Sequence, residues 1–111
     1  MAYSNAVKQT QLGVASALLQ QHGAVSAPVA RAMAQGVRER LRSTYGVSVT
    51  GIAGPGGGTA LKPVGLVYIA IATQTQTTIF QFQFSGARDA IRVRAVTAAL
   101  DILRQEIPTL K

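Results

Sequence analysis

The stretch Val64-Gly65-Leu66-Val67-Tyr68-Ile69-Ala70-Ile71-Ala72 decides the fold of this chain. It is apolar at almost every position, which is typical of a central strand whose two faces are both covered. Pro63 precedes the stretch, and the polar residues 73–78 follow it as a hairpin-like connection. The sequence therefore predicts a buried strand over residues 64–72 that ends in a turn.

Two further strands are predicted, one after this stretch in the sequence and one before it. Residues 79–84 alternate phenylalanine with glutamine after Ile79, so that Phe80, Phe82 and Phe84 share one face. The segment Val47-Ser48-Val49-Thr50 alternates in the same way. We expect the strands over 64–72 and 79–84 to pair antiparallel, because only a short turn separates them.

The spacing of apolar residues predicts helices before and after these strands in the sequence. Ser26 is a suitable N-cap and Pro28 suits a first helical turn. Apolar residues then recur every four positions until Gly46, which is expected to stop the helix: Val29, Met33, Val37 and Leu41. A second helix is predicted from Arg88 to about Glu106, with the apolar positions Ile91, Ala95, Ala98, Ala99, Ile102 and Leu103. Shorter helices are expected over residues 8–12 and 16–22. The predicted fold is a single α/β domain over residues 1–111, a mixed sheet with flanking helices.

The composition excludes several classes of site. The 111 residues include no cysteine, so disulfides and thiolate chemistry are excluded, and the single histidine, His22, argues against a metal site. No feature of the sequence requires a cofactor. No stretch approaches the roughly 20 apolar residues of a membrane-spanning helix, and the first residues lack the features of a signal peptide. We expect a cytoplasmic protein that does not associate with membranes.

The formal net charge of +7 raises the question of nucleic-acid binding. Most of the positive charge comes from two groups of arginines: Arg31, Arg38, Arg40 and Arg42, and Arg88, Arg92, Arg94 and Arg104. No aromatic residues are interleaved with them, as base-stacking modules would require. The pattern favours solvated helix faces that attract anionic small molecules over a nucleic-acid interface.

A glycine-rich loop, Gly51-Ile52-Ala53-Gly54-Pro55-Gly56-Gly57-Gly58-Thr59, joins the first two predicted strands. Its unobstructed backbone amides could form an anion-binding nest, although a long connection rich in positive φ angles would use glycine too. It is not a phosphate loop of nucleotide triphosphatases, because Lys62 lies between Leu61 and Pro63. Lys62 could meet a phosphate or carboxylate, or remain solvated.

Several blocks of sequence together resemble one known family. They are Tyr3-Ser4-Asn5-Ala6-Val7-Lys8, Leu12-Gly13-Val14, His22-Gly23-Ala24-Val25-Ser26, Val49-Thr50-Gly51-Ile52-Ala53-Gly54-Pro55, Gly57-Gly58-Thr59, Lys62-Pro63-Val64-Gly65, and Phe84-Ser85-Gly86-Ala87-Arg88 followed by Ile91-Arg92. In this order they are similar to the C-terminal domain of the competence/damage-inducible CinA family. Stand-alone members of that family are nicotinamide-nucleotide amidohydrolases with a three-layer α/β/α fold.

The resemblance implies hydrolysis of the carboxamide of nicotinamide mononucleotide (NMN) to nicotinate mononucleotide and ammonia. A serine in a Thr-Ala-Glu-Ser-Cys-Thr-Gly-Gly segment is the family's nucleophile, and Tyr3 and Lys8 match the residues that activate it. We assign these residues to substrate binding: Asn5, Gly54, Gly56, Gly57, Gly58, Thr59 and Lys62. No metal ligand is implied.

The chain departs from the family pattern in three places. The serine segment is not present in the 111 residues, and neither Ser4, Ser26 nor Ser48 lies in a matching context. Gly56 and Ala87 stand where the family carries aspartates. The first helix and strand of the domain are therefore expected to be missing, and we expect a longer natural product. The 111-residue chain is expected to be inactive, with an unpaired strand edge and an exposed apolar patch, both prone to association. We expect it to bind a small-molecule nucleotide and to form a homo-oligomer.

Two other classes of function remain open at this point. One is a non-catalytic module that binds a ligand or forms a homo-oligomer. The other is a basic nucleic-acid-binding domain, which a steep salt dependence of binding would support.

Overall fold

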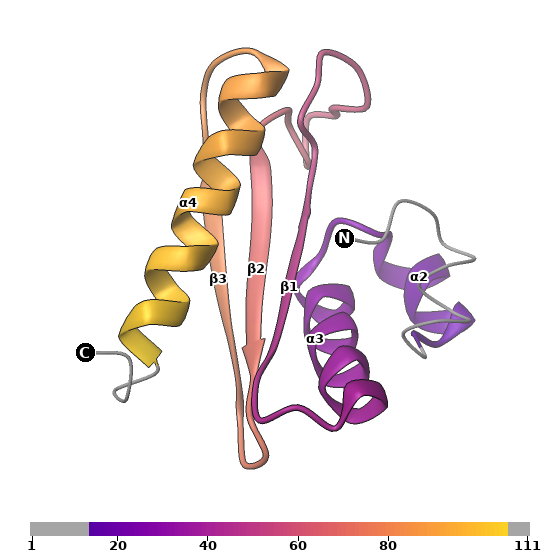
Figure 1. Ribbon diagram of the computed structural model, residues 1–111. Coiled ribbons are helices and arrows are strands. Elements are labelled where there is room, and N and C mark those ends of the chain that lie inside the picture. Colours follow the sequence, from indigo (N-terminus) through magenta and orange to yellow (C-terminus); the bar gives the residue numbers. More distant parts are fainter. Residues whose placement is uncertain (1–13, 107–111) are drawn as a thin grey trace.

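The computed structural model describes residues 14–106 (Figure 1). The elements follow the predicted order: α2 (Ser16–His22), α3 (Ala27–Leu41), β1 (Gly46–Gly51), β2 (Leu66–Ala72), β3 (Thr77–Gln83) and α4 (Arg88–Glu106). The helix predicted over residues 8–12 lies outside the described residues. Ser26 caps α3 as expected, since its Oγ accepts a hydrogen bond from the Val29 N–H at 3.4 Å.

The three strands form one sheet in the order β1-β2-β3. Both pairings are antiparallel, with Val49 opposite Ile69 and Ile69 opposite Phe80. The α/β class and the antiparallel β2–β3 pairing are confirmed, whereas the expected mixture of parallel and antiparallel pairs does not occur among the strands of residues 14–106. Within that range β1 and β3 are the outer strands, and each pairs on one side only. The central β2 is buried at every position except Tyr68, because helices cover both of its faces.

Helices on opposite sides of the sheet make three layers (Figure 1). Val67 and Ile69 of β2 pack with the inner face of α4, which consists of Ile91, Ala95 and Ala99. Phe80 and Phe82 of β3, and Phe84 just after it, extend this cluster, so their predicted common face is confirmed. The Phe82 and Phe84 rings stack with centroids 5.3 Å apart. Alternation of side chains along the strands therefore determines which helix each residue meets.

On the other face, α3 approaches the sheet through small residues. Ala30 and Ala34 of the helix pack directly on Ala70 and Ala72 of β2. The close approach brings the buried hydroxyl of Ser48 on β1 to the carbonyl of Ala30, to which it donates a hydrogen bond of 2.6 Å. A polar strand residue is thus tolerated inside the core because its hydroxyl has a backbone acceptor.

The buried hydroxyl of Ser48 gives a first testable prediction. We expect Ser48→Ala to lower the free energy of unfolding by about 1 kcal/mol, because a buried intramolecular hydrogen bond is lost. Urea unfolding followed by circular dichroism would measure the shift. Thr44→Ala removes a hydroxyl from an exposed position just before β1; it is the matched control and should leave the midpoint nearly unchanged. Equal midpoints for the two variants would contradict the prediction.

Two details of the predicted α3 helix are wrong. The helix ends at Leu41, and Arg42, in a left-handed conformation with φ of 51°, turns the chain; Gly46 instead begins β1. Leu41 is 73% exposed rather than part of the core. A series spaced by four residues advances about 40° around a helix per step, so by its third step Leu41 has rotated away from the buried side of Val29.

Candidate functional site

The glycine-rich loop lies at one end of the sheet, beside the N-terminus of α4 (Figure 1). Residues 52–65 leave β1 and return to β2, and two backbone hydrogen bonds close the base of this loop. The Ile52 N–H donates to the Leu66 carbonyl at 3.0 Å, and the Gly65 N–H donates to the Ile52 carbonyl at 2.6 Å. The loop therefore begins and ends at a fixed point of the sheet.

Arg88, the first residue of α4, holds the loop from one side. Its Nη1 donates a hydrogen bond of 2.9 Å to the carbonyl of Gly54. Gly54 is buried and has a φ of 83°, and a Cβ there would lie 2.7 Å from the Val64 side chain. Only glycine fits this conformation without strain, so the loop can turn sharply beneath the guanidinium.

Lys62 holds the loop from the other side. Its Nζ donates a hydrogen bond to the carbonyl of His22, the last residue of α2. A cation at that position also meets the negative end of the α2 helix dipole. A tight turn supports the lysine, because the Lys62 N–H donates to Thr59 Oγ1 at 3.0 Å and the Thr59 N–H donates to the Lys62 carbonyl at 2.8 Å. The loop is thus connected to two helices that lie far apart in the sequence.

Between these two anchors the loop is open to solvent. Gly56, Gly57 and Gly58 are exposed, and their N–H groups donate to no acceptor within residues 14–106. Space around Gly56 is empty to 4 Å from the position that a Cβ would take. The exposed amides can donate hydrogen bonds to an anionic group, as nests of successive N–H groups do.

The structure brings together part of the predicted site. Gly54, Gly56, Gly57, Gly58, Thr59 and Lys62 all lie in the one loop. Tyr3, Asn5 and Lys8 lie outside the described residues. Ser26 and Ser48 have structural roles as the α3 cap and the β1–α3 contact.

Sequence reasoning missed one residue of this region, Arg88. It belongs to the block Phe84-Ser85-Gly86-Ala87-Arg88, which marked it as part of a motif, but nothing in the spacing connects it to Gly54, 34 residues earlier. The loop and the helix meet only because β3 returns the chain to the same end of the sheet.

Other possible sites were sought in the described part of the chain. Among residues 14–106 no group of three His, Cys, Asp or Glu side chains is arranged to hold a metal ion. No helix in this range is long and apolar enough to cross a membrane. A groove of about 320 Å³ lies between α2, α3 and β3, lined mainly by apolar side chains and by Arg31 and Gln35. It does not include the glycine-rich loop.

Comparisons with known proteins agree with this arrangement. The CinA C-terminal domain family matches residues 1–107. A CinA-like protein of Gloeobacter violaceus is 51% identical over 109 residues, which are 96% of this chain and 26% of that protein. A CinA-like protein of Prochlorococcus marinus is also 51% identical, over 95% of this chain and 25% of its own length. The chain thus spans about a quarter of the length of these curated relatives.

Solved structures share the fold. The competence/damage inducible protein CihA of Agrobacterium tumefaciens superposes with a TM-score of 0.89 at 41% identity, covering 92% of this chain and 63% of that one. A CinA superfamily protein of Escherichia coli gives a TM-score of 0.90 at 31% identity, covering 95% and 61%. Sequence blocks, fold and these comparisons agree, and the chain belongs to the CinA C-terminal domain family.

Proposed function

We propose that this chain supplies the nucleotide-binding wall of a nicotinamide-nucleotide amidohydrolase site. The observation that carries the proposal is the loop of residues 52–65, whose exposed glycine amides lie between two anchoring cations, Lys62 and Arg88. Preorganised N–H donors beside positive charge are suited to a nucleotide phosphate, because no ordering of the loop is needed on binding.

The chemistry of the proposed site is acyl transfer. Lys8 or Tyr3 would accept the proton of a serine hydroxyl as the serine attacks the carboxamide carbon of NMN, and would return that proton to the amide nitrogen so that ammonia leaves. Water would then hydrolyse the acyl-serine, which gives nicotinate mononucleotide and frees the serine hydroxyl. Backbone amides would stabilise the oxyanion. The Thr-Ala-Glu-Ser-Cys-Thr-Gly-Gly segment that carries this serine in the family is not among the 111 residues. We therefore propose that the 111-residue chain binds NMN without hydrolysing it.

Calorimetric titration with NMN and an ammonia-release assay on the same sample test both parts of this proposal. We expect saturable binding of NMN, much weaker binding of nicotinamide riboside, which lacks the phosphate, and no ammonia above the buffer blank. Equal binding of the nucleotide and the riboside, or of neither, would overturn the proposed phosphate site. Ammonia release that Lys8→Ala abolishes would instead show that the chain is catalytically complete.

A further inference from the structure

A groove lies in the layer of α2 and α3, across the sheet from α4 (Figure 1). Its volume is about 320 Å³, near the lower limit of sites that hold small molecules. Its apolar lining comes from three elements: Leu18 of α2, Ile79 of β3, and Ala27, Pro28 and Ala32 of α3. Because this groove does not include the glycine-rich loop, the proposed nucleotide site does not account for it.

The lining of the groove rests on the buried core. Leu18 and Ala32 pack against the buried cluster that joins α2 to α3, and Ile79 packs against the alanine cluster between α3 and β2. Gln35, at the far end of the lining on α3, is held by a hydrogen bond of 3.0 Å from its Nε2 to Thr77 Oγ1 of β3. The walls are therefore already ordered, so little free energy is lost in arranging them around a ligand.

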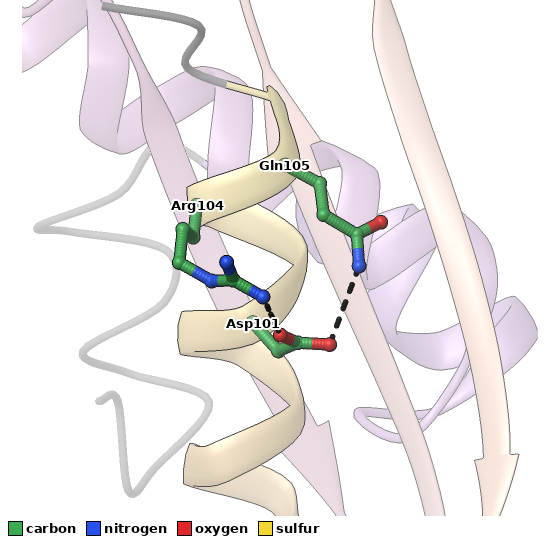
Figure 2. Close-up of polar contacts among 3 residues, drawn as sticks. All are labelled: Asp101, Arg104 and Gln105. Carbon is green, nitrogen blue, oxygen red and sulfur yellow. Dashed lines mark hydrogen bonds and ion pairs between the residues drawn. The ribbon is translucent and has the colours of Figure 1, made fainter. Parts of the chain in front are cut away.

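One cation, Arg31, lies among these apolar residues. Its side chain is exposed, and within residues 14–106 it has no ion-pair partner. The ion pair found in this range joins Arg104 Nη2 to Asp101 Oδ1 on α4 at 2.8 Å, and Gln105 Nε2 approaches the other oxygen of Asp101 at 3.4 Å (Figure 2). The first turn of α3 has no acidic residue either. Arg31 therefore keeps its positive charge available for an external anion.

A carboxylate on an apolar body matches this combination. The guanidinium of Arg31 offers N–H donors in a planar fork whose geometry suits the two oxygens of a carboxylate. Rings laid against Leu18, Pro28 and Ile79 would lose contact with water, which favours binding. A nucleotide matches less well, because Arg31 and Gln35 are the polar residues of the lining, and a phosphate with its ribose needs several donors.

We propose that the groove between α2, α3 and β3 binds small carboxylic acids that carry an apolar ring system, with the carboxylate paired to Arg31. Rings are favoured over a flexible chain because fewer rotatable bonds are immobilised on binding. An ion pair at an exposed arginine contributes little, so we expect a dissociation constant of about 0.1–1 mM. Since the groove is separate from the glycine-rich loop, this proposal does not depend on the proposed nucleotide site.

Titration of the 111-residue chain with sodium 2-naphthoate, followed by methyl NMR spectra, tests the site. We expect saturable shifts of the methyl signals of Leu18, Ala32 and Ile79. 2-Naphthamide has the same shape without the charge and should bind about threefold to fivefold more weakly. Acetate, which lacks the rings, should produce no saturable shift.

Three results of this titration would overturn the proposal. One is the absence of saturable shifts, and another is a set of shifts centred on the glycine-rich loop or on the exposed side of α4. The third is a shift of the groove methyl signals when the unliganded chain is diluted, which would show that a second copy of the chain occupies the groove.

Two arginine substitutions test the role of charge. Arg31→Gln should raise the dissociation constant of 2-naphthoate about threefold to fivefold and leave that of 2-naphthamide unchanged, because the ion pair is lost and the apolar contacts remain. Arg40→Gln is the matched control, since it removes the same charge from an exposed position of α3 outside the lining, and it should change neither constant. Equal effects of the two substitutions would assign the attraction to the net charge of the whole protein and refute the site. Circular dichroism verifies that both variants fold.

Discussion

Gly65→Ala is expected to destabilise the domain by about 3–5 kcal/mol, a large part of the total stability of a small domain. Gly65 has a φ of 95°, which a residue with a Cβ adopts only under strain. A Cβ at this position would also lie 1.9 Å from the carbonyl oxygen of Phe84. Neither atom can move easily, because the Phe84 N–H donates to the Gly65 carbonyl at 2.9 Å.

The matched control is Gly56→Ala in the same loop. Gly56 has open space where a Cβ would be placed, and its φ is not positive, so alanine should change stability by less than about 0.5 kcal/mol. Urea unfolding of the two variants and the parent chain would measure the difference. Similar unfolding midpoints for both variants would show that the chain just before β2 tolerates a side chain at Gly65, contrary to this prediction.

Arg88→Ala is expected to raise the dissociation constant for NMN about tenfold to a hundredfold. A hydrogen bond from a charged group is worth about 1.5–3 kcal/mol, and this one holds the Gly54 carbonyl that begins the glycine turn. In the proposed site Arg88 would act as a positioning residue, through its hydrogen bond to the loop. Faster amide hydrogen exchange at Ile52, Thr59 and Gly65, whose N–H groups are hydrogen-bonded in the loop, would report the loosened loop directly in the unliganded variant.

Two controls separate positioning from simple charge attraction. Arg40→Ala removes the same charge from an exposed position on α3 and should leave NMN affinity and loop exchange unchanged. Arg88→Lys keeps the charge but loses the guanidinium geometry, so it should restore only part of the affinity. If Arg40→Ala weakens binding as much as Arg88→Ala does, the effect belongs to the overall field of the protein and the positioning role is excluded.

Much of the fold could be predicted from local sequence patterns. The alternation in residues 79–84 and the continuous apolar run of residues 64–72 were enough to identify a strand with one polar face and a central strand, because the side-chain period of a strand is visible in the sequence. The cap at Ser26 and the long α4 helix followed from equally local rules. Helix ends were predicted less well, since a left-handed Arg42 has no strong local signal.

The candidate site was only partly predictable, for a physical reason. The glycines of the loop can be recognised in the sequence, because few other residues adopt their backbone conformations. The contacts that hold the loop cannot be recognised there, since Lys62 contacts His22, 40 residues away, and Arg88 contacts Gly54, 34 residues away. The sequence predicted an exposed apolar patch without naming its residues; in the structure Val93, Val96 and Leu100 of α4 are exposed.

By itself, the sequence determined the α/β class, the order of the elements, the position of the glycine-rich loop and the family. The class, the order of the elements and the position of the loop depend on periods of two and 3.6 residues and on backbone freedom, all of which act over a few neighbouring residues. The family rests instead on the resemblance of several sequence blocks to its pattern. Tertiary structure alone decided that Arg88 and Lys62 hold the loop from two sides and that Val93, Val96 and Leu100 remain exposed. Such contacts arise only when antiparallel pairing brings distant segments to one end of a sheet, a long-range outcome that no local pattern encodes.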